Sequence, residues 1–170
     1  MKKILIGFLA LSLLTTFSCK KATVLNGGSF TFKSTSYSVT SAIGNTTADN
    51  SLVCINSPTN SYNECQFIFY SSIVGGAQVI PYPTAGSYQV VTGAPDTTGT
   101  QLSINLVLTT GATYNAKTYA VDPNANVHAT VTVSGGELHI SLPAVNMINI
   151  HDSTDHGTLT ATVMQTSATE

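Results

Sequence analysis

Apolar and polar residues alternate one by one along most of this 170-residue chain, and this alternation limits the fold more than any other feature. Leu102, Ile104 and Leu106, for example, are separated by Ser103 and Asn105. A period of two places successive side chains on opposite faces of a β-strand, one buried and one in water. No stretch after residue 18 has the period of an α-helix. We therefore expect an all-β protein.

The clearest pair of strands spans residues 126–142. Two alternating segments flank Gly135 and Gly136, and glycines in a two-residue turn adopt the positive φ angles that a tight hairpin needs. Both segments have a continuous apolar face, which fixes the register across the turn. The predicted partners are Ser134 with Glu137, Thr132 with His139, and Thr130 with Ser141. The predicted apolar face comprises Val127, Ala129, Val131, Val133, Leu138, Ile140 and Leu142.

The strands predict a single domain over residues 29–166, followed by a C-terminal tail at 167–170. We expect an antiparallel two-sheet β-sandwich of about eight to ten strands. An up-and-down, lipocalin-like β-barrel is the alternative, because the strands from Gln101 onward follow one another as a meander. A sandwich has a filled core, whereas a barrel with a hollow core could hold a small apolar ligand.

Residues 1–18 have the features of an export signal. Two lysines precede an apolar segment, Ile4 to Leu14, that is too short to span a membrane as a helix. Cys19 follows where cleavage would occur, and this arrangement resembles the signal peptide of bacterial lipoproteins. The resemblance implies that Cys19 carries acyl chains and that residues 19–28 tether the chain to a membrane. An ordinary secretory signal that contains a cysteine is the alternative.

Thr16 stands where the strict lipoprotein motif has leucine. Phe17-Ser18-Cys19 followed by lysines is instead similar to the looser signal of Bacteroidota lipoproteins. Segments such as Phe30-Thr31-Phe32 and Gly86-Ser87-Tyr88 are similar to recurring pieces of small lipoproteins of unknown function from that phylum. This resemblance implies an all-β fold and an outer-membrane location, and no activity. Lys20 and Lys21 favour the periplasmic face, because surface-exported relatives usually have acidic residues there.

Charged residues make up 8% of the chain, against about 25% in an average soluble domain. The basic residues are six lysines, and the sequence has no arginine. We exclude nucleic-acid binding, because it needs clustered basic side chains that displace counterions from phosphates. The lack of arginine also excludes bidentate recognition of a carboxylate or a phosphate. The composition does not exclude a protein or a glycan as a partner.

Cys54 and Cys65 remain once Cys19 is assigned to the lipid anchor. An exported chain reaches an oxidising compartment, where an even pair of cysteines commonly forms a disulfide. Each cysteine lies at the end of an apolar segment next to the intervening loop, so a disulfide would close the mouth of a hairpin. Two buried free thiols are the alternative.

Residues 151–156 form the densest group of potential metal ligands in the sequence. His151, Asp152, Asp155 and His156 could converge on zinc or another divalent metal ion if this segment folded back on itself. The alternative is a solvated loop between two strands, running up to Thr158, in which Asp, Ser and Thr form local turns. No other cofactor is expected.

We expect no enzyme activity. The sequence has no Gly-x-Ser-x-Gly nucleophile elbow, and its scattered carboxylates offer no glycosidase pair. His128 and His139 share the polar face of their hairpin, but about 13 Å of strand separates them, which is too far for a shared ion.

Two further features concern carbohydrates. Tyrosines together with many hydroxyl and amide side chains could form a glycan-binding face, although the chain has no tryptophan; packing within the sheet is the alternative. Asp96-Thr97-Thr98 and Asp152-Ser153-Thr154 resemble the pattern at which exported Bacteroidota proteins are O-glycosylated, so Thr97 and Ser153 are candidate glycosylation sites. The tyrosines considered are Tyr62, Tyr70, Tyr82, Tyr88, Tyr114 and Tyr119.

These features predict a lipid-anchored cell-envelope protein that acts as a non-catalytic structural or interaction module. A small-molecule-binding or glycan-binding lipoprotein is the alternative. A metal-dependent enzyme that uses the His151–His156 segment is the third possibility.

Overall fold

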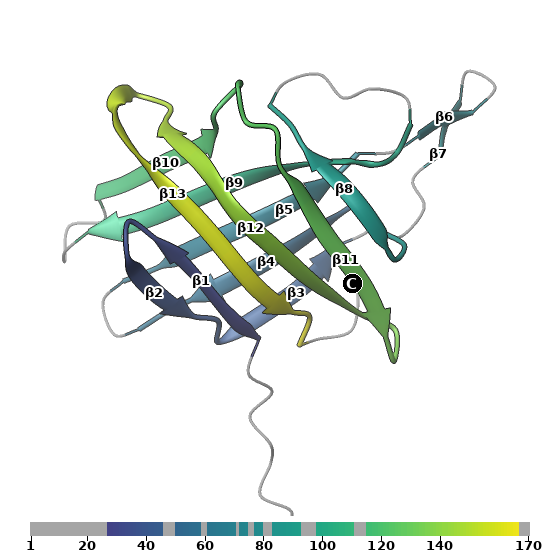
Figure 1. The fold of residues 1–170 in the computed structure, drawn as a ribbon. Helices are drawn as coiled ribbons and strands as arrows, with labels where there is room; N and C mark the ends of the chain where they lie inside the picture. The colour runs from purple at the N-terminus through teal and green to yellow at the C-terminus, as the bar shows by residue number, and fades with distance from the viewer. Residues whose placement is uncertain are drawn as a thin grey trace, which may run out of the picture.

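The computed structural model consists of β-strands joined by turns and loops (Figure 1). It describes residues 27–45, 50–58, 61–70, 72–74, 77–79, 83–92, 98–110 and 115–166. Thirteen strands and no helix lie in these ranges, so the prediction of an all-β protein is confirmed, with more strands than the sequence suggested. Within the same ranges, no helix has the length and hydropathy needed to cross a membrane.

The strands of the described residues are numbered in chain order. They are β1 (Gly28–Phe32), β2 (Thr35–Ser38), β3 (Ser41–Asn45), β4 (Ser51–Asn56), β5 (Asn63–Phe69), β6 (Ser72–Val74), β7 (Ala77–Val79), β8 (Gly86–Val90), β9 (Gln101–Thr110), β10 (Asn115–Val121), β11 (His128–Ser134), β12 (Glu137–Asn149) and β13 (Asp152–Met164).

Burial alternates along the strands as the sequence pattern predicts. In β9, Leu102, Ile104 and Leu106 are buried, while Asn105 is exposed. The hairpin of β11 and β12 has the predicted register, and both turn glycines have positive φ angles. Val133 was expected in the core but is 40% exposed. It lies at the tip of the hairpin, where residues 132–136 are all exposed and no second layer covers them.

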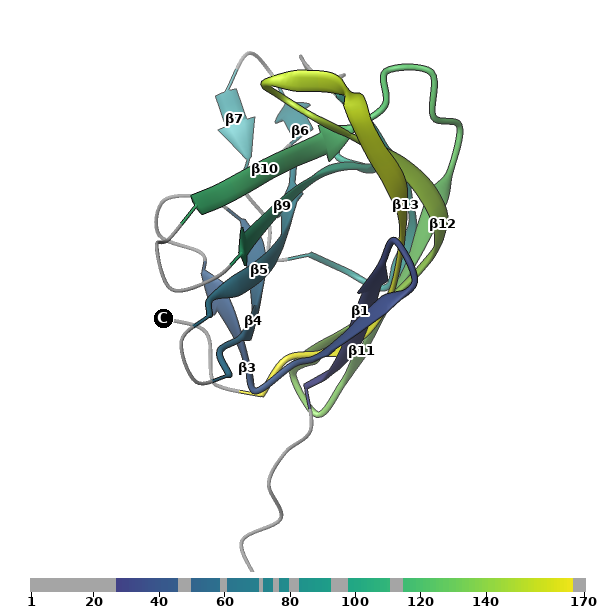
Figure 2. The same cartoon turned by 90° about the vertical axis from the view of Figure 1, so that its left-hand side faces the viewer.

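Eleven strands form one hydrogen-bonded sheet that folds over on itself, while β6 and β7 pair separately. Figure 2 shows two layers, one with β3, β4, β5, β9 and β10 and the other with β1, β11, β12 and β13. Two strands join the layers: β10 pairs with β9 and β12, and β8 pairs with β9 and β11. Strands β8, β9, β10, β12 and β11 thus make a closed ring. The β8–β9 pair is parallel, which the sequence did not predict.

Large apolar side chains fill the space between the two layers. None of those named here exposes more than 1% of its surface, and burial of a side chain of this size contributes roughly 1.5–3 kcal/mol. They come from both layers: Phe30, Phe32, Leu52, Phe67, Leu102, Ile104, Leu106, Leu138, Ile140, Met147 and Leu159.

Hydroxyl side chains form a row across the strands from β2 to β8. All but one of these residues are exposed, and Ser29 is half-buried. This layer therefore meets water largely through Ser and Thr, in line with the low charge of the chain. In the pairing register, the row runs through Ser38, Ser29, Thr162, Ser141, Thr130 and Ser87.

The prediction of a polar loop between the last two strands is wrong. The chain turns at Ile150 and His151, and β13 begins at Asp152. The pairing of β12 with β13 shifts between Ile148 and Asn149, so the extra polar residues are absorbed by an irregularity in the ladder.

We predict that Gly28→Ala destabilises the protein more than Gly136→Ala. Both glycines have nearly the same positive φ, 86° and 87°, which costs an alanine about 1–2 kcal/mol. At Gly28 an added Cβ would also clash with the carbonyl oxygen of Thr162 in β13, whereas nothing lies within 4 Å of a Cβ at Gly136. Urea unfolding of both variants measures the difference, and equal losses would show that β1 and β13 separate at no cost.

Candidate functional site

Four polar side chains converge on the carboxylate of Asp155, near the start of β13. Lys33, in the β1–β2 turn, forms an ion pair with Oδ1, and Lys117 of β10 forms one with Oδ2 at 2.7 Å. The Tyr119 hydroxyl and the Asn149 side-chain amide also donate to Oδ2, at 3.0 and 3.2 Å. These five residues, called the Asp155 cluster, join both layers of the sheet.

The position of Lys33 follows from the tight turn between β1 and β2. Lys33 and Ser34 both have positive φ angles, 48° and 68°, as a two-residue hairpin turn requires. The Lys33 ammonium lies 5.4 Å from the ring centroids of both Phe32 and Tyr119, which stabilises its charge through cation–π interactions. The two rings themselves pack 4.7 Å apart. The turn thus holds a lysine over an aromatic surface.

The ion pairs shift the protonation equilibria of the cluster. Hydrogen bonds from Lys117 and Lys33, and then from Asn149 and Tyr119, hold the pKa of Asp155 well below its ordinary value. The same bond to Asp155 raises the pKa of Lys117. The pKa of Tyr119 is raised by burial and by its bond to Asp155. Lys117 and Asp155 are therefore both charged at neutral pH.

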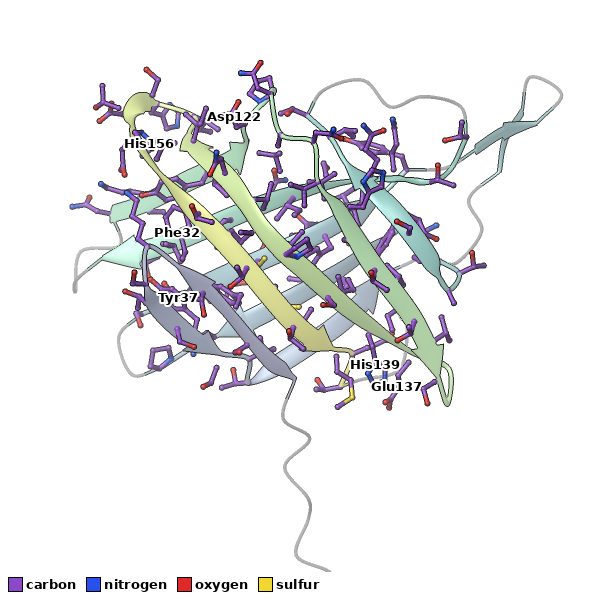
Figure 3. The ribbon with its side chains drawn as sticks, in the orientation of Figure 1. Phe32, Tyr37, Asp122, Glu137, His139 and His156 are labelled. Carbon is purple, nitrogen blue, oxygen red and sulfur yellow. The ribbon has the colours of Figure 1, made fainter. Side chains whose placement is uncertain are left out.

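A groove of about 660 Å³ lies beside the Asp155 cluster. This volume is within the range of roughly 300–1,000 Å³ that small-molecule sites occupy. Figure 3 shows two of its residues, Phe32 on β1 and Tyr37 on β2. The lining combines aromatic, hydroxyl, amide and ammonium groups: Phe32, Lys33, Thr35, Ser36, Tyr37, Ser38, Asn56, Pro58, Ser61, Asn63, Leu108, Thr109, Lys117 and Tyr119.

Tyr37 is fixed in the groove wall by the core. Its ring stacks on Phe30, with centroids 5.0 Å apart and planes 16° from parallel. Phe30 is fully buried, whereas Tyr37 is partly exposed and lines the groove. The partial burial of Tyr37 raises the pKa of its hydroxyl. The ring is a preformed aromatic surface for a ligand.

A chain of amide hydrogen bonds connects the two layers along the groove. Asn56 donates to the carbonyl of Ser38 at 2.7 Å, and Asn63 donates to the Asn56 side-chain oxygen at 3.1 Å. The backbone N–H of Thr109 donates to the Asn63 side-chain oxygen at 3.3 Å. These bonds tie the edge strand β2 to β4, β5 and β9, which fixes the width of the groove.

The four predicted metal ligands are not grouped around one point. Asp155 is engaged by the two lysines, and Asp152 accepts bonds from the hydroxyl and backbone N–H of Thr154, which lower the pKa of Asp152. His151 is exposed in the turn, and His156 lines a separate depression. Within the described ranges, no three His, Cys, Asp or Glu side chains are grouped to hold a metal ion. The metal site stays a prediction, and Asp155 would have to exchange both lysines to serve in it.

The other histidines are separated as the sequence analysis expected. His139 pairs with Thr132, and His128 lies four residues further along β11, opposite Gln89. The depression beside His156 also includes Asp122 and Ser153. Figure 3 places His156 and Asp122 at one end of the molecule and His139 at the other.

Cys54 and Cys65 lie directly opposite each other in β4 and β5, and both are fully buried. The structure has them as free thiols. Burial raises the pKa of both thiols, so neither is a ready nucleophile. Their pairing across the strands is compatible with the predicted disulfide, which stays a prediction.

Some predicted residues lie outside the described ranges, namely Cys19, Thr97, Tyr82 and Tyr114. The candidate glycosylation residue Ser153 is exposed at the start of β13. Of the tyrosines that the sequence analysis considered, Tyr119 lines the groove. Tyr62 donates to Glu64, and this bond, after burial, raises the Tyr62 pKa to about 12. Tyr88 is buried against Phe69.

No sequence motif marks Lys33, Lys117 or Tyr37 as functional residues. One signal was available: Lys33 and Lys117 are the only basic residues between positions 27 and 166. Nothing in their spacing along the chain indicates that they meet, because the contact depends on how β10 crosses between the layers.

We predict that Asp155→Asn lowers the melting temperature at pH 7 and removes part of its acid dependence. Because the pKa of Asp155 is lower in the folded protein, its stabilisation is complete above the unfolded pKa, about 3.9, and is lost as the pH falls through the folded value. The difference between wild type and variant should therefore shrink as the pH falls from about 4 towards 2. Thermal melts between pH 2 and 7 test this, with Asp122→Asn as control, since Asp122 accepts bonds from Asn124 and not from a lysine. A constant difference at all pH values would contradict it.

No family model matches the chain, and neither a curated protein nor a solved structure matches it. Its function is therefore inferred from the residues of the groove and of the Asp155 cluster.

Proposed function

We propose that this protein is a lipid-anchored, non-catalytic interaction module of the cell envelope, and that its groove binds a glycan. The groove beside the Asp155 cluster is the observation on which this proposal depends. It brings a preformed aromatic ring, amides and hydroxyls to one surface, and these are the groups that bind a polyhydroxylated ligand. The lipoprotein-like signal supports an anchor at Cys19 in the outer membrane, and Lys20 and Lys21 support the periplasmic face.

The distribution of side chains favours a sandwich with an external site over a barrel with an internal one. Phenylalanine, leucine and isoleucine side chains that are almost fully buried occupy the space between the layers. A ligand would therefore bind outside this core, where β2 and the ends of β4, β5, β9 and β10 leave the groove.

The groove residues are suited to binding rather than to catalysis. Asp155, the carboxylate that contacts the groove residues Lys33, Lys117 and Tyr119, is paired with two ammonium groups, and its pKa is lowered. Such a carboxylate is a poor general acid or base at neutral pH. The amides of Asn56 and Asn63 are held by one another and by the backbone, so they can orient a ligand without rearranging.

Cys19→Ser should release the protein from the membrane fraction into the soluble fraction, because serine has no thiol to form the thioether with a diacylglyceryl group. Fractionation of cells that express each variant measures this. Cys54→Ala removes a thiol of the folded domain and should leave the protein on the membrane. Retention of the Cys19→Ser protein would contradict the lipid anchor.

Tyr37→Ala should abolish glycan binding, because it removes the aromatic surface while the Phe30 ring beneath stays in the core. The full chain, purified in a non-ionic detergent, is applied to an array of neutral and acidic oligosaccharides. Tyr62→Ala is the matched control, since Tyr62 lies outside the groove lining. Absence of binding to every glycan, or equal loss in both variants, would contradict the proposed function.

A further inference from the structure

We propose that the groove selects acidic saccharides, in which a sugar carboxylate binds between Lys33 and Lys117. This inference rests on the proposed function and specifies its ligand. The lining includes both basic side chains of residues 27–166, and no acidic residue is among the described residues of the lining. Asp155 forms ion pairs with both lysines and neutralises one of their two charges. The group of Lys33, Asp155 and Lys117 thus carries a net charge of +1, which the nearby charge of Asp152 weakens at Lys117.

Both ammonium groups keep hydrogen-bonding capacity for a ligand. A lysine ammonium has three N–H donors, and Asp155 accepts one from each. The side chains of Lys33 and Lys117 are 41% and 51% exposed, so the remaining donors reach the solvent. Asp155 fixes the two ammonium groups beside one carboxylate, and the aromatic contacts restrain Lys33 further. Less side-chain entropy is lost when a ligand binds to groups already held in place.

The walls favour a sugar over an acidic peptide as the carrier of the carboxylate. Tyr37 presents a ring on which the apolar C–H face of a pyranose can stack. Thr35, which shares a face of β2 with Tyr37, adds a hydroxyl group to this wall, and Asn56 and Asn63 add amides. Many short-range donors and acceptors around one aromatic ring suit a dense array of hydroxyl groups, and two ammonium groups suit its carboxylate.

The test compares two ligands that differ only in the carboxylate. Galacturonate oligomers and neutral galactose oligomers of equal length and linkage are titrated calorimetrically into the full chain in non-ionic detergent. We expect the acidic oligomer to bind about tenfold more tightly, the scale of one charge-assisted hydrogen bond. Added salt should reduce this preference, because both lysines are solvent-exposed.

The variants distinguish a local effect of the groove lysines from an effect of the net charge of the protein. Lys117→Gln should remove most of the preference for the acidic oligomer, because it lowers the affinity for the acidic oligomer by more than the affinity for the neutral one. Lys21→Gln makes the same change in net charge outside the described residues and should alter neither affinity. Melting curves of both variants verify that the protein is folded, and Lys33→Gln provides a second local variant.

Three results would overturn the inference. Equal affinities for the two oligomers, with Tyr37→Ala still abolishing binding, would refute acid selection and leave glycan binding intact. An equal loss in Lys21→Gln and Lys117→Gln would indicate general electrostatic attraction. Binding of an oligoglutamate peptide as tight as that of the galacturonate oligomer would refute the sugar as ligand class.

Discussion

Strand β10 joins the two layers by pairing with a strand of each, and the rest of the structure depends on this constraint. Its pairing with β9 and β12 closes the ring of strands and brings Lys117 and Tyr119 to the start of β13. The Asp155 cluster then ties this crossing to the β1–β2 turn through Lys33. Without the crossing, the lysines would lie on separate sheets, and the groove between β2 and the opposite layer would have no fixed width.

The outer surface explains how a chain with so few charges remains a well-patterned β-protein. The row of serine and threonine hydroxyls from β2 to β8 supplies polarity at the exposed strand positions. Threonine also suits strands because it is β-branched. The few lysines of the domain are thus not used for solubility across the surface. Both lysines lie at one site, where they supply the positive charge of the groove lining.

Local patterns in the sequence were sufficient to predict local structure. The register of the β11–β12 hairpin could be predicted because the turn glycines and two alternating segments all give the same pairing. Val133 was placed wrongly because alternation states which face a residue is on, and not whether another layer covers that face. The site itself was out of reach, since the contact of Lys33 and Lys117 with Asp155 joins three distant segments. Two residues of the Asp155 cluster were nevertheless predicted from the sequence as candidate binding residues: Asp155 as a metal ligand and Tyr119 as part of a glycan-binding face.

The direction of β1 determines how a tethered molecule presents its groove. The strand begins at Gly28, next to the last residues of β13, and ends at the turn that holds Lys33. A tether that precedes Gly27 would therefore join one end of β1, while Lys33 lies at the other end and the groove runs along β2 between them. A chain anchored in this way would hold its two lysines on the side remote from the lipid. The length of the tether would then control how far from the bilayer a ligand can be reached, independently of how tightly the groove binds it.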